Sequence, residues 1–70
     1  MKLEIKCNDG VWRYVFCRAM NGGYDFKTDS AVITTERKAN AYKSFGEEQA
    51  RKDVEYFTQH SHGCPVRIAA

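Results

Sequence analysis

Two histidines and a cysteine at alternate positions are the residues of this sequence whose types and spacing could do chemistry. They stand in the run His60-Ser-His62-Gly-Cys64. Imidazole and thiolate groups bind zinc, but a zinc site needs four ligands, or three and a water, and alternate residues share a face only in an extended strand. This run crosses the expected end of a helix, which breaks the alternation. We interpret the histidines as helix-terminal groups that complement the helix dipole, and we predict no metal site.

A Cys-His dyad is the other chemistry that these residue types suggest. Such a dyad needs a third group that orients the base, together with donors for an oxyanion, and no such motif accompanies the run. The chain also lacks a glycine-rich phosphate loop, a nucleophile elbow and a zinc-protease motif. We therefore predict that the protein is not an enzyme and needs no cofactor.

The length and composition indicate a single folded domain over residues 1–70. A chain of 70 residues buries only about 60% of its unfolded surface, which leaves little room for an active-site cleft. The net charge of +2 is small for a dedicated nucleic-acid binder. No apolar run is long enough to span a bilayer, and the first residues lack the features of a secretory signal. Three cysteines without a CxxC pair favour reduced thiols, so we expect a cytoplasmic protein without membrane contact.

The stretch DGVWRYVFCRAMNGG carries an aromatic residue at every second position. Residues 1–7 alternate as a strand with one apolar face, and Asp9-Gly10 is typical of a two-residue hairpin turn. Counting outward from that turn gives three pairs on one face of the sheet: Cys7 with Trp12, Ile5 with Tyr14, and Leu3 with Phe16. We predict this register, which makes the three aromatic side chains part of the core rather than an exposed platform for stacking bases.

A three-residue loop, Asn8-Asp9-Gly10, is the alternative for the same hairpin. It sets Ile5 opposite Arg13 and moves the aromatic residues to the face that carries Glu4 and Lys6, because a slip of one residue reverses every side chain. This register leaves the aromatic stripe without a core to line.

Two further extended segments are expected before the helix. Asn21-Gly22-Gly23 begins a turn, and residues 24–28 are predicted as the returning strand. Two-residue and three-residue versions of this turn give opposite facings for Tyr24 and Phe26, and we prefer the three-residue version, which aligns them with the aromatic stripe. Residues 29–43 are predicted as a fourth extended piece plus a solvated loop at Glu36 to Asn40, with a turn of helix over residues 36–42 as the alternative.

A capped helix and a last strand complete the expected fold. Ser44 and Glu47 have the spacing of a capping box, and a helix from about Phe45 to His60 follows. Its apolar stripe is Ala50, Val54 and Phe57, and Glu47–Arg51 and Glu48–Lys52 are expected ion pairs on its exposed side. Gly63 and Pro65 end the helix, and Cys64, Val66 and Ile68 alternate as a final strand. The prediction is an α+β domain: an antiparallel sheet of three to four strands, in the order β-β-β-(β)-α-β, with one helix on one face.

These motifs resemble those of the YegP-like family, small domains of unknown function. The matching positions are Leu3-Glu4-Ile5, Asp9-Gly10, Trp12-Arg13, Asn21-Gly22, Asp29-Ser30, Tyr42-Lys43-Ser44 and Ala50. Most of them are turn, cap or core positions, so the resemblance implies a fold rather than a chemistry. Residues 31–41 are longer than the usual link of that family. Some members carry two tandem copies of the unit, which implies that a single copy could pair with itself as a homodimer.

The function expected from these features is a non-catalytic protein-interaction module. A likeness in architecture alone to small phage proteins that inactivate a host complex suggests an accessory or inhibitory factor. The alternative is a weakly basic nucleic-acid-binding domain. The candidate interaction surface for that alternative consists of basic residues on the wet sheet face and in the following loop: Lys2, Lys6, Arg13, Arg37 and Lys38. An open sheet also leaves edge groups that a second copy could pair with.

Overall fold

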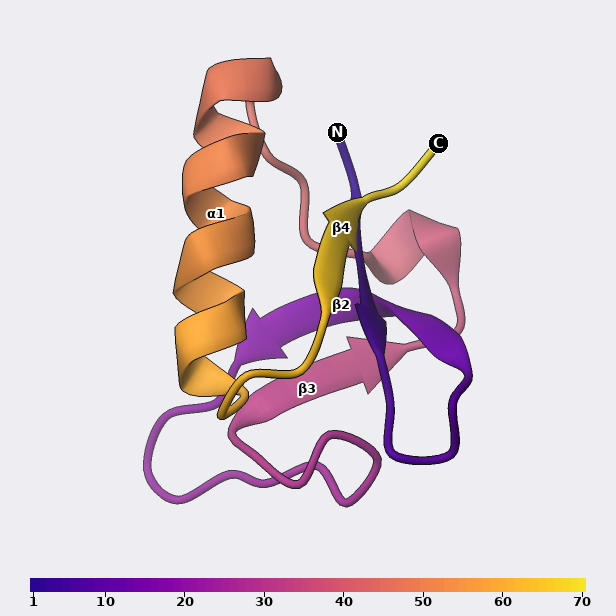
Figure 1. The fold of residues 1–70 in the computed structure, drawn as a ribbon, viewed down its shortest axis with the longest axis vertical. Helices are drawn as coiled ribbons and strands as arrows, with labels where there is room; N and C mark the ends of the chain where they lie inside the picture. The colour runs from indigo at the N-terminus through magenta and orange to yellow at the C-terminus, as the bar shows by residue number, and fades with distance from the viewer.

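The computed structural model describes residues 1–70 and consists of a four-stranded antiparallel sheet with one helix packed against it (Figure 1). The sheet has the order β3-β2-β1-β4. The elements in chain order are β1 (Leu3–Lys6), β2 (Trp12–Arg18), β3 (Val32–Thr35), the 3-10 turn η1 (Lys38–Asn40), α1 (Glu47–His60) and β4 (Val66–Ile68). This arrangement confirms the predicted α+β fold class, and α1 lies alongside β4 (Figure 1).

Aliphatic residues of three strands form the core against the helix. Leu3, Ile5, Val15 and Val32 have no exposed surface, and they pack with Ala50 and Phe57 of α1 in one buried cluster. Val54 packs against the same cluster, so the predicted apolar stripe of the helix is confirmed. The inner face of the sheet is therefore the face that carries Leu3 and Ile5.

The register of the β1–β2 hairpin differs from the predicted one. Ile5 pairs with Arg13, and Lys6 pairs with Trp12, as in the three-residue alternative. The amide of Gly10 donates to the carbonyl oxygen of Cys7 at 2.9 Å, and Gly10 has a φ of 80°. These are the marks of a turn followed by a left-handed glycine, the usual form of a three-residue hairpin loop. The aromatic residues of β2 are consequently not on the core face, and that prediction was wrong.

An ion pair inside the hairpin accounts for the longer loop. The carboxylate of Asp9 accepts hydrogen bonds from Arg13 Nη1 at 3.0 Å and Nη2 at 2.9 Å, and a third from the amide of Val11 at 3.0 Å. The bonds from Arg13 and from Val11 lower the pKa of Asp9 to about 2. A two-residue loop would turn Arg13 to the opposite face and lose this bidentate contact, which is among the stronger hydrogen-bonded pairs in proteins.

The long segment between β2 and β3 is the second departure from the prediction. Residues 24–28 form no strand, and only an isolated bridge joins Asp25 to Ser30. Asp25, Thr28 and Ser30 are buried, whereas Tyr24 and Phe26 are 48% and 86% exposed. The alternation of the sequence is therefore inverted, with polar side chains inside and aromatic ones outside.

Hydrogen bonds to β3 explain this inversion. Asp25 Oδ2 accepts from both the amide and the hydroxyl of Thr34 at 2.8 Å, and Ser30 Oγ accepts from the amide of Val32 at 3.0 Å. Thr28 Oγ1 lies 2.8 Å from Ser30 Oγ and donates to the carbonyl oxygen of Val32 at 2.8 Å. The buried polar groups are thereby satisfied, and two amides of the edge strand β3 are occupied by side chains.

The start of the helix also differs in detail. The capping residue is Gly46, with a φ of 87°, and α1 begins at Glu47 rather than near Phe45. Ser44 does not cap the helix, because its hydroxyl donates to Asp53 Oδ2 at 2.6 Å. The predicted end at His60 is confirmed. Both predicted i,i+4 ion pairs are present, at 2.6 Å for Glu47–Arg51 and 4.0 Å for Glu48–Lys52.

Candidate interaction surface

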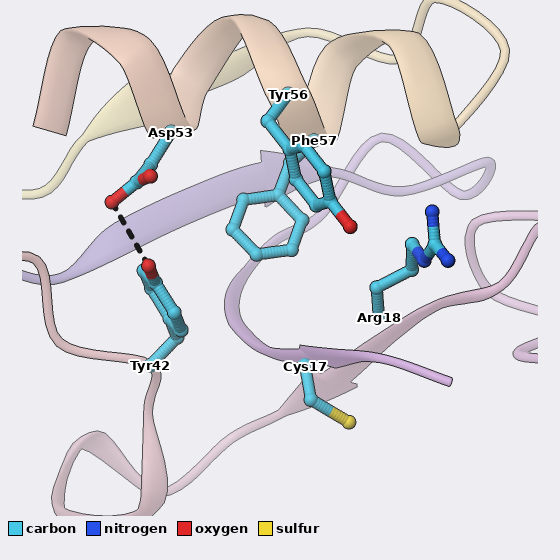
Figure 2. A pocket seen from close by; sticks show the side chains of 6 residues that line it. All are labelled: Cys17, Arg18, Tyr42, Asp53, Tyr56 and Phe57. Carbon is cyan, nitrogen blue, oxygen red and sulfur yellow. Dashed lines mark hydrogen bonds between the residues drawn. The ribbon is translucent and has the colours of Figure 1, made fainter. Parts of the chain in front are cut away.

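A surface pocket of about 400 Å³ lies between the end of β2 and one side of α1. Six residues line it: Cys17, Arg18, Tyr42, Asp53, Tyr56 and Phe57. Figure 2 shows Asp53 and Arg18 at opposite ends, with the aromatic rings between them. The pocket is therefore apolar in the middle and carries one charge of each sign at its ends.

Three rings in edge-to-face contact form the apolar part of the pocket. The centroid of the Phe57 ring lies 5.2 Å from those of Tyr42 and Tyr56, with interplanar angles of 75° and 87°. Such perpendicular pairs are favourable beyond the area that they bury. Phe57 is 3% exposed and Tyr56 is 42% exposed, so the rings lead from the core to the surface.

Asp53 closes one end of the pocket as a fully bonded carboxylate. Its Oδ2 accepts from the hydroxyl groups of Ser44 at 2.6 Å and Tyr42 at 3.0 Å, and its Oδ1 accepts from Gln49 Nε2 at 2.9 Å. Burial opposes the ionisation of Asp53, but these three hydrogen bonds outweigh it and lower the pKa of the carboxyl group. Burial and the neighbouring carboxylate raise the pKa of Tyr42. Asp53 therefore anchors the Tyr42 segment to the helix.

Arg18 stands at the other end of the pocket without an anionic partner. Its Nη1 lies 3.2 Å from His60 Nε2, its Nη2 donates to Met20 Sδ at 3.5 Å, and its guanidinium carbon lies 5.7 Å from the centre of the Tyr56 ring. None of these three partners is an anion. Three other arginines in the chain pair with carboxylates: Arg13 with Asp9, Arg51 with Glu47 and Arg67 with Glu4.

Three large apolar side chains of the β2–β3 segment project into solvent. Met20, Tyr24 and Phe26, here called the loop patch, are 68%, 48% and 86% exposed. The rings of Tyr24 and Phe26 touch edge to face at 5.1 Å. The contact between Met20 and Arg18 joins the loop patch to the rim of the pocket. The loop patch is thus held in place by the hydrogen bonds of the buried residues Asp25, Thr28 and Ser30.

The outer face of the sheet carries the aromatic residues of β2. Trp12 and Tyr14 are half-buried there, and their partners on β1 are Lys6 and Glu4. The guanidinium of Arg67 lies 3.8 Å above the Trp12 ring, and its Nε donates to Glu4 Oε1 at 3.0 Å. Basic and aromatic groups therefore share this face, contrary to the predicted arrangement.

The five residues of the predicted interaction surface do not form one patch. Arg13 is turned to the inner face with a side chain only 12% exposed, and it is held by Asp9. Lys6 is exposed opposite Trp12. Lys2 Nζ donates to the carbonyl oxygen of Ala41 at 2.9 Å, which places it beside the segment that carries the other two residues, Arg37 and Lys38, both of them exposed.

The histidine-cysteine run is spread over different contacts. No group of three or more metal-binding side chains is close enough to hold a metal ion. His60 contacts Arg18 and Tyr56, while Cys64 Sγ points to the carbonyl oxygen of Thr28 at 3.6 Å. All three cysteines are free thiols.

The sequence interpretation missed the pocket, although one signal of it was visible. Asp53 lies between Ala50 and Phe57 on the buried side of α1, where a charged residue needs partners. The positions of Arg18 and Tyr42 depend on contacts between distant parts of the chain, which carry no local pattern.

Comparison with known proteins adds no identity. No family model matches the chain, and neither a curated protein nor a solved structure matches it. The resemblance to YegP-like domains therefore stays a prediction. No helix of the structure has the length and apolar character needed to cross a membrane.

Proposed function

We propose that the protein is a non-catalytic protein-interaction module that binds its partner through the loop patch and the adjoining pocket rim. The observation that carries this proposal is the inverted β2–β3 segment, in which Asp25, Thr28 and Ser30 are buried and hydrogen-bonded while Phe26 is 86% exposed. Nothing in the isolated chain covers this ring beyond its edge contact with Tyr24.

The energetics of association favour such an arrangement. Aromatic residues, methionine and arginine are enriched in the centres of protein interfaces, and a few of them supply most of the binding energy. The hydrogen bonds of Asp25 to Thr34 fix the segment before any partner arrives. A surface that is already ordered loses less conformational entropy on binding. A homodimer, or an accessory or inhibitory role toward a host complex, is a specific form of this proposal.

Removal of the loop patch should abolish partner binding. The test compares the wild type with a variant that combines Met20→Ser, Tyr24→Ser and Phe26→Ser, as bait in affinity capture from the source cell or its host. Loss of a buried aromatic anchor costs about 2 kcal/mol or more, so the affinity for the captured protein should fall at least about 30-fold. The matched control is Phe45→Ser, because Phe45 is 85% exposed and directly precedes α1, whose N-terminal end lies at the opposite end of the molecule from the β2–β3 segment (Figure 1).

The control and the variant separate the outcomes. A protein captured equally by the wild type and the patch variant would contradict the use of this surface. Light scattering of the wild type at tens of micromolar tests for a second copy, since a mass of twice 8.0 kDa that reverts to monomer in the patch variant would identify the partner as the chain itself.

A nucleic-acid-binding domain is the second candidate, and the outer face of the sheet favours it. Trp12 and Tyr14 lie on the same side as Lys6 and Arg67, as a platform for single-stranded nucleic acid requires. The ion pair between Glu4 and Arg67 weakens this candidate, because it neutralises one of the few cations on that face.

Tryptophan fluorescence tests this candidate directly, since Trp12 is the sole tryptophan. Stacking of a base on the ring should quench the emission on titration with an oligonucleotide of deoxythymidine. With contacts from Lys2, Lys6 and Arg67, the slope of log affinity against log salt should be about −2. Arg67→Gln should weaken binding, whereas Arg51→Gln, at an arginine that also pairs with a glutamate but lies on the exposed side of α1, serves as control. An unchanged emission at low salt would eliminate the nucleic-acid candidate.

A further inference from the structure

We infer that the pocket beside α1 binds the C-terminal residue of a partner polypeptide, with the α-carboxylate on Arg18 and a large apolar side chain against the rings of Tyr42, Tyr56 and Phe57. This inference rests on the proposed function and names the chemistry of its partner. It is carried by the charge of Arg18, which no carboxylate in the chain neutralises, at the rim of an aromatic pocket.

Arg18 is suited to receive an anion. It is half-buried, and its contacts are an imidazole nitrogen of His60, the thioether of Met20 and the ring of Tyr56. If a ligand carboxylate replaced His60 and Met20 as the partner of Arg18, the charges of the guanidinium and of the carboxylate would neutralise each other. A guanidinium and a carboxylate form two parallel hydrogen bonds, which are shorter and stronger than bonds between neutral groups.

The rest of the pocket is suited to an apolar group rather than to a second charge. Its volume of about 400 Å³ falls in the range of ligand sites, which typically combine apolar walls with a few polar groups. Asp53, at the far end, already accepts three hydrogen bonds and stays ionised, so it repels another carboxylate and offers little to a cation. A ligand is therefore oriented with its anionic end toward Arg18 (Figure 2).

A chain terminus meets these requirements more simply than an internal acidic residue. A terminal residue carries its carboxylate and its side chain on the same Cα, so both can enter one small pocket. An internal aspartate or glutamate needs a second residue for the apolar contact, and its main chain must continue past the pocket on both sides. The geometry thus favours a free C-terminus with a large apolar side chain.

The test uses a short acetylated peptide of glycine and serine that ends in phenylalanine, together with its C-terminal amide. Binding to the full chain is followed by two-dimensional NMR, with the signals of the pocket residues as readout. We expect the acid to bind at least about 10-fold more tightly than the amide, because hydrogen bonds between two charged groups are stronger than those to a neutral group. A peptide that ends in alanine should bind more weakly than the one that ends in phenylalanine.

Variants of Arg18 and Arg37 locate the carboxylate. Arg18→Gln should reduce the affinity for the acid to that for the amide and leave the amide unchanged. Arg37→Gln is the matched control, because Arg37 is exposed and forms no ion pair, and its affinity for the acid should equal that of the wild type. Arg18→Lys, which keeps the charge, should retain part of the preference for the acid and serves if the glutamine variant does not fold.

Three results of the peptide test would overturn the inference. They are equal affinity for acid and amide, tighter binding of an amidated peptide with an internal aspartate beside phenylalanine, and no change in the pocket signals at about 10 mM peptide. The capture experiment tests the proposed function separately. If Arg18→Gln still captures the cellular partner and the patch variant does not, the inference about the C-terminus is wrong while the interaction module stands.

Discussion

Replacement of Phe57 by alanine should lower the free energy of unfolding by about 3–5 kcal/mol, the usual loss for a buried phenylalanine. Phe57 is 3% exposed, belongs to the central apolar cluster and contacts the rings of Tyr42 and Tyr56. A domain of 70 residues has a total stability of roughly 4–10 kcal/mol, so this one change removes a large part of it. No neighbouring side chain can fill the space that the Phe57 ring leaves, because the strands contribute only smaller aliphatic side chains to the cluster.

Urea unfolding followed by far-ultraviolet circular dichroism measures this effect. Phe45→Ala is the control, since Phe45 is 85% exposed, and its free energy of unfolding should stay within about 0.5 kcal/mol of the wild-type value. Equal unfolding midpoints for Phe57→Ala and Phe45→Ala would contradict the burial of Phe57 in the core.

The helix could be predicted from the sequence because its determinants are local. Ala50, Val54 and Phe57 recur at the helical period, and the two Glu-Lys/Arg pairs lie four residues apart. The start of the helix was predicted incorrectly because the hydroxyl of Ser44 binds Asp53, in the middle of α1, instead of the backbone amides at the helix start. Ser44 had two possible hydrogen-bond partners, the nearby backbone amides and the more distant Asp53, and tertiary packing selected Asp53.

The hairpin register could not be decided from alternation alone. Both faces of β2 carry apolar groups, since Trp12 and Tyr14 lie on one face and Val15 on the other. The choice between them depends on the Asp9–Arg13 pair and on the helix, whose Phe57 fills the space that the aromatic stripe was predicted to occupy. The stripe is therefore mostly a surface, which is why the interaction surfaces were underestimated.

The loop patch was missed for a related reason. Tyr24 and Phe26 alternate with polar residues as in a strand, but the carboxylate of Asp25 binds Thr34, nine residues further along the chain. No short-range sequence pattern predicts the contact between Asp25 and Thr34. This contact turns Asp25 inward and therefore places Tyr24 and Phe26 on the outside. The prediction that Lys2, Lys6 and Arg13 share one surface was based on the incorrect register. In the structure Arg13 lies on the inner face of the sheet, away from the two lysines.

Replacement of Asp53 by alanine should have the second large effect on stability, about 3 kcal/mol. The change leaves the hydroxyl of Ser44, which is 1% exposed, without its acceptor, and each buried donor without a partner costs about 1–3 kcal/mol. It also releases Tyr42 from the helix, so the end of the pocket loosens. Glu48→Ala is the matched control on the same helix, because the side chain of Glu48 is 92% exposed, and it should change the stability by less than about 0.5 kcal/mol.

The pH dependence of unfolding distinguishes a lost carboxylate from a mere loss of packing at Asp53. The folded pKa values of Asp53 and Asp25 are lowered, and that of Asp9 is lowered to about 2, whereas an unfolded aspartate titrates near about 3.9. Between these values the unfolded chain binds more protons, so stability is complete above about pH 5 and falls as the pH drops through about 4 toward about 2. Asp53→Ala should lose less stability than the wild type across this window, since one of the three carboxylates is already absent. Thermal unfolding at pH 7, 4 and 2.5 measures both slopes, and a wild-type midpoint that does not fall between pH 4 and 2.5 would show that these hydrogen-bonded carboxylates do not stabilise the fold.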